Sequence, residues 1–274
     1  MSAQVIVLSG YGLNCEEETL FAFRHVGLDG DIVHINDVID SPKMLEAYQV
    51  LCVPGGVSYG DDTGSGNAFA QKMKLALWDN LKAFVERDTL TLGICNGCQI
   101  LTNLGLVPAF DKAYGKRDIA VTYNKSARYQ CRWIDLKVAE NNSPWLSGIE
   151  SMHIPVAHGE GRFMMEDTTL AKLKANKQIA FHYVTPEGQP ANEEFPYNPN
   201  GSVGDIAAIT DESGKVLVMM PHPERGMFTW QRDDYMEVKD AAQRGGQEVP
   251  EESDGLAIFK NAAIYFESTL KKSA

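Results

Sequence analysis

Short apolar, β-branched runs alternate with longer amphipathic stretches over the first third of the chain. Residues 5–8, 32–35, 50–53 and 90–94 form the apolar runs and predict strands. Between them, residues 16–26 and 67–85 predict helices. In the second helix an apolar stripe recurs at helical spacing, formed by Phe69, Met73, Leu77, Leu81 and Phe84. Strands that alternate with helices predict a three-layer α/β sandwich around a mostly parallel central sheet.

The pattern changes after residue 128, where predicted strands follow one another with less helix between them. These strands are residues 128–139, 152–156, 179–184, 206–209 and 216–220. We expect them to add antiparallel strands to the same sheet, so that residues 1–274 form a single domain. Residues 231–254 are polar and acidic, which predicts a solvated surface excursion. A final helix should follow, with one apolar face made of Leu256, Phe259, Ala263, Phe266 and Leu270.

Composition narrows the class of protein. The 274 residues are 44% hydrophobic, as in ordinary globular proteins, and carry a formal net charge of −12. This charge argues against a nucleic-acid or anionic-membrane surface, because either needs a basic patch. Without a bilayer-spanning run or a basic flank before residues 5–8, we expect an unexported, cytoplasmic protein. Five cysteines do not indicate a disulfide framework.

A cysteine stands where one of the predicted strands meets a helix. The segment Gly93-Ile94-Cys95-Asn96-Gly97 follows an apolar run and precedes a helix that starts near Gln99. A nucleophile on such an elbow needs small neighbours, and the two glycines provide them. The helix N-terminus supplies free N–H groups and partial positive charge, which favour a thiolate and can hold an oxyanion. Cys95 is therefore a candidate nucleophile.

The matching base and carboxylate follow another predicted strand. Residues 216–220 lead into Pro221-His222-Pro223-Glu224, where Pro223 fixes the backbone between the two polar residues. A further loop, Pro54-Gly55-Gly56, follows a strand that should lie parallel to the elbow strand. A glycine N–H there would complement the N–H of Asn96 as an oxyanion hole. The sequence thus predicts hydrolase-like chemistry.

These residues are also compatible with other chemistry. A cysteine between glycines is commonly a small core residue, and Cys98 gives Cys95 the C-x-x-C spacing of a redox dithiol. Histidines at His-x-Glu spacing, His158-Gly159-Glu160 and His222-Pro223-Glu224, could be metal ligands, but no helical zinc spacing occurs and we predict no metal site. The chain also lacks the glycine-rich lysine motif of a phosphate-binding loop, so we expect no ATP site.

The motifs resemble those of class I glutamine amidotransferases, in particular the glutaminase components of phosphoribosylformylglycinamidine synthases. The resemblance runs from about residue 5 to residue 225. It rests on the Cys95 elbow (GICNGCQ) and on residues 54–61 (PGGVSYGD), 154–161 (IPVAHGEG), 200–206 (NGSVGDI) and 219–225 (MMPHPER). It implies a flavodoxin-like fold and a Cys95–His222–Glu224 triad. The implied oxyanion hole consists of the N–H groups of Gly56 and Asn96, and Gly55, Gln99, His158 and Glu160 are implied substrate-binding residues.

The resemblance also implies the reaction and its partners. Cys95 would cleave the side-chain amide of glutamine through a thioester, and the ammonia would pass to a large synthetase subunit that makes formylglycinamidine ribonucleotide in purine synthesis. A small helper subunit would complete the complex. ATP and magnesium are expected on the synthetase, and no cofactor on this chain. The alternatives left open are the glutaminase of another amidotransferase, a C-x-x-C redox protein and a non-catalytic binding module.

Overall fold

The computed structural model describes the backbone of residues 3–272 and the side chains of residues 3–268. Within this range one sheet contains nine strands in the order β2-β1-β3-β4-β11-β10-β9-β6-β7. Neighbours from β2 to β11 pair parallel and those from β11 to β7 antiparallel. The predicted α/β fold, with antiparallel strands added to a parallel sheet, is confirmed. One expectation is wrong: residues 216–219, expected among the antiparallel additions, form β11, which pairs parallel with β4 and antiparallel only with β10.

The parallel part contains β1 (Gln4–Ser9), β2 (Asp29–His34), β3 (Val50–Val53), β4 (Leu90–Ile94) and β11 (Val216–Met219). The antiparallel part contains β6 (Gln130–Val138), β7 (Ser151–His158), β9 (Ile179–Val184) and β10 (Ile206–Thr210). β5 (Ala120–Thr122) and β8 (Arg162–Met164) form a separate antiparallel pair, which the sequence analysis missed.

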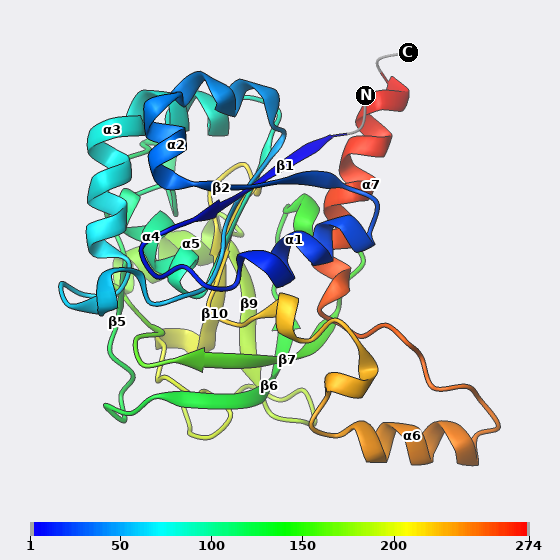
Figure 1. Cartoon of the computed structure of the whole chain (residues 1–274). Coiled ribbons are helices and arrows are strands. Elements are labelled where there is room, and N and C mark those ends of the chain that lie inside the picture. The colour runs from blue at the N-terminus through cyan, green and yellow to red at the C-terminus, as the bar shows by residue number, and fades with distance from the viewer. Residues whose placement is uncertain (1–2, 273–274) are drawn as a thin grey trace.

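Helices cover both faces of the parallel part (Figure 1). α1 (Glu16–His25) and α7 (Leu256–Lys272) lie on one face, and α2 (Ile35–Asp40), α3 (Asn67–Glu86) and α4 (Asn96–Leu104) lie on the other. A further short helix, α5 (Asp167–Ala175), precedes β9. None of the helices in residues 3–272 combines the length and apolar character needed to cross a bilayer.

Buried apolar side chains join the helices to the sheet. The predicted stripe of α3 is buried over its whole length, from Phe69 to Phe84. In α7, Leu256, Phe259, Ala263 and Phe266 are buried as predicted, whereas the side chain of Leu270 lies outside the described residues. Burial of this apolar surface is the main force that holds helices on a sheet.

The acidic excursion of residues 231–254 lies on the surface, as predicted, but it is not irregular throughout. It contains a helix, α6 (Tyr235–Arg244), none of whose residues is buried. Figure 1 shows α6 standing away from the body of the molecule. Apolar residues do recur at helical spacing in α6, but the polar and acidic composition of the excursion favoured an irregular segment, and none of these residues packs in the core.

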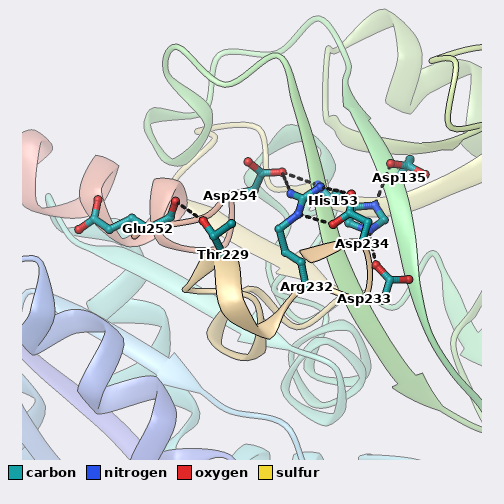
Figure 2. Close-up of polar contacts among 8 residues, drawn as sticks. All are labelled: Asp135, His153, Thr229, Arg232, Asp233, Asp234, Glu252 and Asp254. Carbon is teal, nitrogen blue, oxygen red and sulfur yellow. Dashed lines mark hydrogen bonds and ion pairs between the residues drawn. The ribbon is translucent and has the colours of Figure 1, made fainter. Parts of the chain in front are cut away.

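Polar contacts fix the two ends of this excursion to the sheet (Figure 2). Arg232 makes a bidentate pair with Asp234 at 2.7 and 2.8 Å and also reaches Asp254, at 3.5 Å. The Asp254 carboxylate in turn accepts a hydrogen bond of 2.7 Å from the backbone N–H of His153 on β7. The excursion is therefore anchored at its root, next to the outermost antiparallel strand.

Candidate active site

Cys95 lies at the sharp turn between β4 and α4. Its backbone has φ 50° and ψ −104°, a conformation that non-glycine residues seldom adopt, and the residue is buried with 5% exposure. A Cβ on Gly97 would lie 1.8 Å from the carbonyl oxygen of Val53, and one on Gly93 would lie 2.8 Å from the carbonyl oxygen of Gly97. Gly97 is therefore needed for α4 to pack against β3, and Gly93 for α4 to pack against its own strand, β4.

The base reaches the nucleophile from the neighbouring strand. β11 pairs parallel with β4, and the Cys95 N–H donates to the Met219 carbonyl at 2.8 Å, so the two strand ends stay together. The chain then turns, and the His222 N–H donates to the Pro155 carbonyl at 2.8 Å. This places His222 and Cys95 in the lining of one pocket.

Glu224 orients the imidazole of His222. Their Nδ1 and Oε1 atoms lie 2.6 Å apart, and each residue is 1% exposed. Burial opposes the charged ring, but the Glu224 carboxylate and Cys95 more than offset this and raise the pKa of His222 well above its ordinary value. Nε2 has no hydrogen-bond partner among the described residues. It is therefore the nitrogen left to exchange protons with Cys95 and a substrate.

The glycine loop after β3 is locked to the start of α4. The Gly97 N–H donates to the Pro54 carbonyl at 3.1 Å, and the Ser58 N–H donates to Oδ1 of Asn96 at 3.1 Å. Gly56 lines the pocket with Cys95, and its N–H has no acceptor among the described residues. Asn96 is the first residue of α4, where backbone N–H groups lack helical partners. These two N–H groups can hold a developing oxyanion.

Three of the four predicted substrate-binding residues lie in the wall of the pocket. Gln99, His158 and Glu160 line the pocket, while Gly55 lies behind it, where a Cβ would come within 2.8 Å of Cε1 of His222. The Gln99 amide donates to the Glu160 carbonyl and accepts from the side chain of Asn96. Gln99 thus shapes the pocket wall with both ends of its amide occupied.

His158 is part of the wall rather than a second base. Its Nδ1 lies 3.1 Å from Oδ1 of Asn124, and its Nε2 lies 3.5 Å from Nδ2 of Asn200. Burial and the nearby His222 lower the pKa of His158 to about 3, so the ring is neutral. Both ring nitrogens are therefore engaged within the protein.

Sequence reasoning gave no role to Cys15, which the structure places against the triad. Its Sγ accepts a hydrogen bond from Nη2 of Arg225 at 2.8 Å, and burial raises the pKa of the Cys15 thiol. Ligand atoms of Cys15, His222 and Glu224 lie within 4.8 Å of one another, as do those of a second group, His153, Asp233 and Asp234. Only the tertiary contacts with residues more than 200 positions away reveal Cys15, so no local signal could have found it.

Cys98 does not behave as the partner of a redox dithiol. It is fully buried on the first turn of α4, and burial raises the pKa of its thiol well above the ordinary value. A redox-active cysteine needs an accessible, readily ionised thiol. By contrast, Cys95 faces a pocket with a base, a carboxylate behind the base and two N–H donors, which is a set suited to acyl transfer through a thioester.

Known proteins with similar sequences and folds agree with this chemistry. The CobB/CobQ-like glutamine amidotransferase domain family matches residues 2–266. The phosphoribosylformylglycinamidine synthase subunit PurQ of Methanococcus maripaludis is 49% identical over 96% of this chain and 97% of that protein. The subunit of the same name from Dehalococcoides mccartyi is 36% identical over 94% and 96%. A chain in the structure of PurLQS from Thermotoga maritima superposes with a TM-score of 0.68 at 28% identity, covering 97% of this chain and 99% of that one.

Proposed function

This chain belongs to the glutamine amidotransferase family and, within it, to the PurQ subunits of phosphoribosylformylglycinamidine synthase, and we propose that Cys95, His222 and Glu224 release ammonia from glutamine for that synthase. The observation that carries the assignment of residues is the buried His222–Glu224 pair beside Cys95 on its strained elbow. The chain is thus the glutaminase component of an enzyme of purine biosynthesis.

The reaction begins with the thiolate of Cys95, paired with the imidazolium of His222. The sulfur attacks the side-chain amide carbon of glutamine, and the N–H groups of Gly56 and Asn96 hold the oxyanion of the tetrahedral intermediate. As the intermediate collapses, the C–N bond breaks. His222 gives its proton to the departing nitrogen, so ammonia leaves and a γ-glutamyl thioester remains on Cys95.

Water completes the cycle. Neutral His222, held in orientation by Glu224, takes a proton from the water that attacks the thioester carbon. Collapse of this second intermediate breaks the C–S bond and releases glutamate. The thiolate–imidazolium pair is restored, and the net reaction converts glutamine and water to glutamate and ammonia.

The ammonia goes to a synthetase subunit, which uses ATP and magnesium to convert formylglycinamide ribonucleotide to formylglycinamidine ribonucleotide. The likeness to a chain of PurLQS supports an assembly with a large synthetase subunit and a small helper subunit. ATP and magnesium belong to the partner in this proposal, and this chain needs no cofactor of its own. A cytoplasmic location goes with this role.

The test compares two nitrogen sources in the assembled synthase. With wild type, both glutamine and ammonium chloride should support formation of the amidine product. With Cys95→Ala, glutamine should fail and ammonium chloride should still work, because the synthetase is untouched. Amidine formation from glutamine by the Cys95→Ala complex would overturn the proposal, as would a folded wild-type complex that never uses glutamine.

A further inference from the structure

A buried thiol that the proposed mechanism does not use lies beside the triad. Cys15 precedes α1 and is 0% exposed, and burial raises the pKa of its thiol, which is therefore neutral. Its Sγ accepts a hydrogen bond from Nη2 of Arg225 at 2.8 Å and donates one to Oδ1 of Asn14 at 3.3 Å. The sulfur also lies next to the His222 ring, since a Cβ on Gly55 would come within 3.0 Å of Sγ and 2.8 Å of Cε1 of His222.

The backbone of Cys15 is fixed to the loops of the active site. Its N–H donates to the Gly55 carbonyl at 3.2 Å, and its carbonyl accepts from the Thr19 hydroxyl at 2.6 Å. The same glycine loop is joined to α4 at the Pro54 carbonyl. The sulfur therefore has a fixed position relative to the turn between β4 and α4.

Arg225 brings a positive charge to the triad. Its Nε lies 3.9 Å from Oε1 of Glu224 and 4.0 Å from Oε1 of Glu18, and the residue lines the pocket together with Cys95. The side chain of Arg225 is 38% exposed, so the guanidinium is free to turn toward water unless another group holds it. The two carboxylate contacts are long and constrain it weakly, whereas the hydrogen bond to Cys15 is short and directional.

A positive charge is needed here because the reactive form of the triad is negative. The thiolate of Cys95, the imidazolium of His222 and the carboxylate of Glu224 together carry one negative charge, and the last two residues are each 1% exposed. A buried net charge is costly unless an opposite charge lies close to it. The guanidinium of Arg225 supplies that opposite charge.

We propose that Cys15 is a positioning residue whose thiol holds the guanidinium of Arg225 beside Glu224, where it balances the negative charge of the reacting triad. This inference rests on the proposed glutaminase function and adds a residue that does not itself line the pocket. Because Cys15 acts through Arg225, removing its thiol should have no further effect once the guanidinium is gone.

The test is a double-mutant cycle in the assembled synthase. The quantity measured is kcat/KM for glutamine-dependent ammonia release by wild type, Cys15→Ala, Arg225→Gln and the double variant. Cys15→Ala should lower kcat/KM by about 10- to 100-fold, because a hydrogen bond that holds a charged group is lost. The double variant should be no slower than Arg225→Gln alone.

Two further readouts distinguish positioning from a merely structural role. Cys15→Ser keeps an acceptor for the Arg225 hydrogen bond and should retain most of the wild-type kcat/KM. In Cys15→Ala the acidic limb of the pH profile of kcat/KM should move to higher pH, because the thiolate form of the triad loses its balancing charge. Arg225→Gln changes a part-exposed side chain, so it should fold even if Cys15→Ala does not, and it should show the same displacement.

The matched control is Cys52→Ala, which removes a fully buried sulfur from β3 and should change neither the rate nor the pH profile. Amidine formation from ammonium chloride shows that each variant complex is assembled. The other titratable groups around the triad are the same in all variants, so a displaced profile reports the loss of the Cys15 contact. These groups are Glu18, Asp61, Tyr129, His158 and Glu160.

The outcomes separate this inference from the function on which it rests. If wild type cleaves glutamine but Cys15→Ala is fully active, or its loss multiplies with that of Arg225→Gln, Cys15 does not act through Arg225 and the inference is wrong. A loss that serine does not restore, or that leaves the acidic limb in place, would also overturn it, because either result indicates a structural role. If wild type does not cleave glutamine, the function itself fails.

Discussion

Replacing Gly97 by alanine tests whether the close approach of α4 to β3 builds the active site. The new Cβ would lie 1.8 Å from the carbonyl oxygen of Val53 and 2.6 Å from its carbonyl carbon. Cβ contacts under 3.0 Å essentially do not occur, so the backbone must move by more than about 1 Å. Both partners are buried backbone, which leaves no flexible side chain to give way.

The expected size of the effect follows from two opposing contributions. Alanine within a helix is more favourable than glycine by about 0.5–1 kcal/mol. Overpacking of a buried contact costs about 1–3 kcal/mol, and more where backbone must shift. We therefore expect a net loss of about 1–2 kcal/mol in the free energy of unfolding. Displacement of Cys95 from Gly56 by about 1 Å should lower kcat/KM for glutamine by about 100-fold.

Urea unfolding and glutamine-dependent ammonia release in the assembled synthase measure the two effects. The control is Gly245→Ala at the end of α6, where φ is −78° and the nearest atom would be 3.4 Å from the added Cβ. That variant should change stability by less than about 0.5 kcal/mol and leave activity intact. A Gly97→Ala protein with wild-type stability and activity would refute the argument that this contact sets the elbow.

Two further predictions concern ionisable groups. Glu224→Gln removes the charge that raises the pKa of His222, so this pKa should fall and kcat/KM should drop by about 10²–10⁴-fold, with its pH profile displaced; an unchanged profile would contradict the assigned role. His153 lies 2.9 Å from Asp135 and 2.8 Å from Asp233, and although burial opposes it, these carboxylates raise its pKa above 6.5. Its stabilising contribution is therefore complete below pH 6.5 and is lost as pH rises through the higher folded pKa. Amide hydrogen exchange in residues 231–254 should therefore speed up with pH by more than the intrinsic chemical exchange rate does. His153→Gln should abolish this additional pH dependence. If the variant keeps the same additional pH dependence as wild type, His153 is not its source.

The sequence predicts those site residues whose identity is required by the backbone geometry of their own short segment. Gly93 and Gly97 flank Cys95 because the elbow leaves no room for a side chain, and this requirement is visible in five consecutive residues. The parallel pairing of β1 to β4 followed from apolar runs that alternate with amphipathic helices. His222 and Glu224 could be predicted as a pair because only Pro223 separates them and its rigid backbone brings their side chains together.

The rest depends on contacts between distant segments. Cys15 touches Arg225 only after α1 and the turn beyond β11 have packed together, so its spacing in the sequence carries no signal. His158 was predicted to contact the substrate because of its position near Glu160. In the folded protein Asn124 and Asn200 occupy both of its ring nitrogens, which the sequence does not reveal.

Ammonia release from glutamine by three forms of the assembled synthase tests the central claim most directly. The forms are wild type, Cys95→Ala and Cys98→Ser, each checked for folding. If Cys95 is the nucleophile, wild type and Cys98→Ser should release ammonia at similar rates, and Cys95→Ala should release none above background. Activity that survives in Cys95→Ala, or that is lost only in Cys98→Ser, would contradict the account.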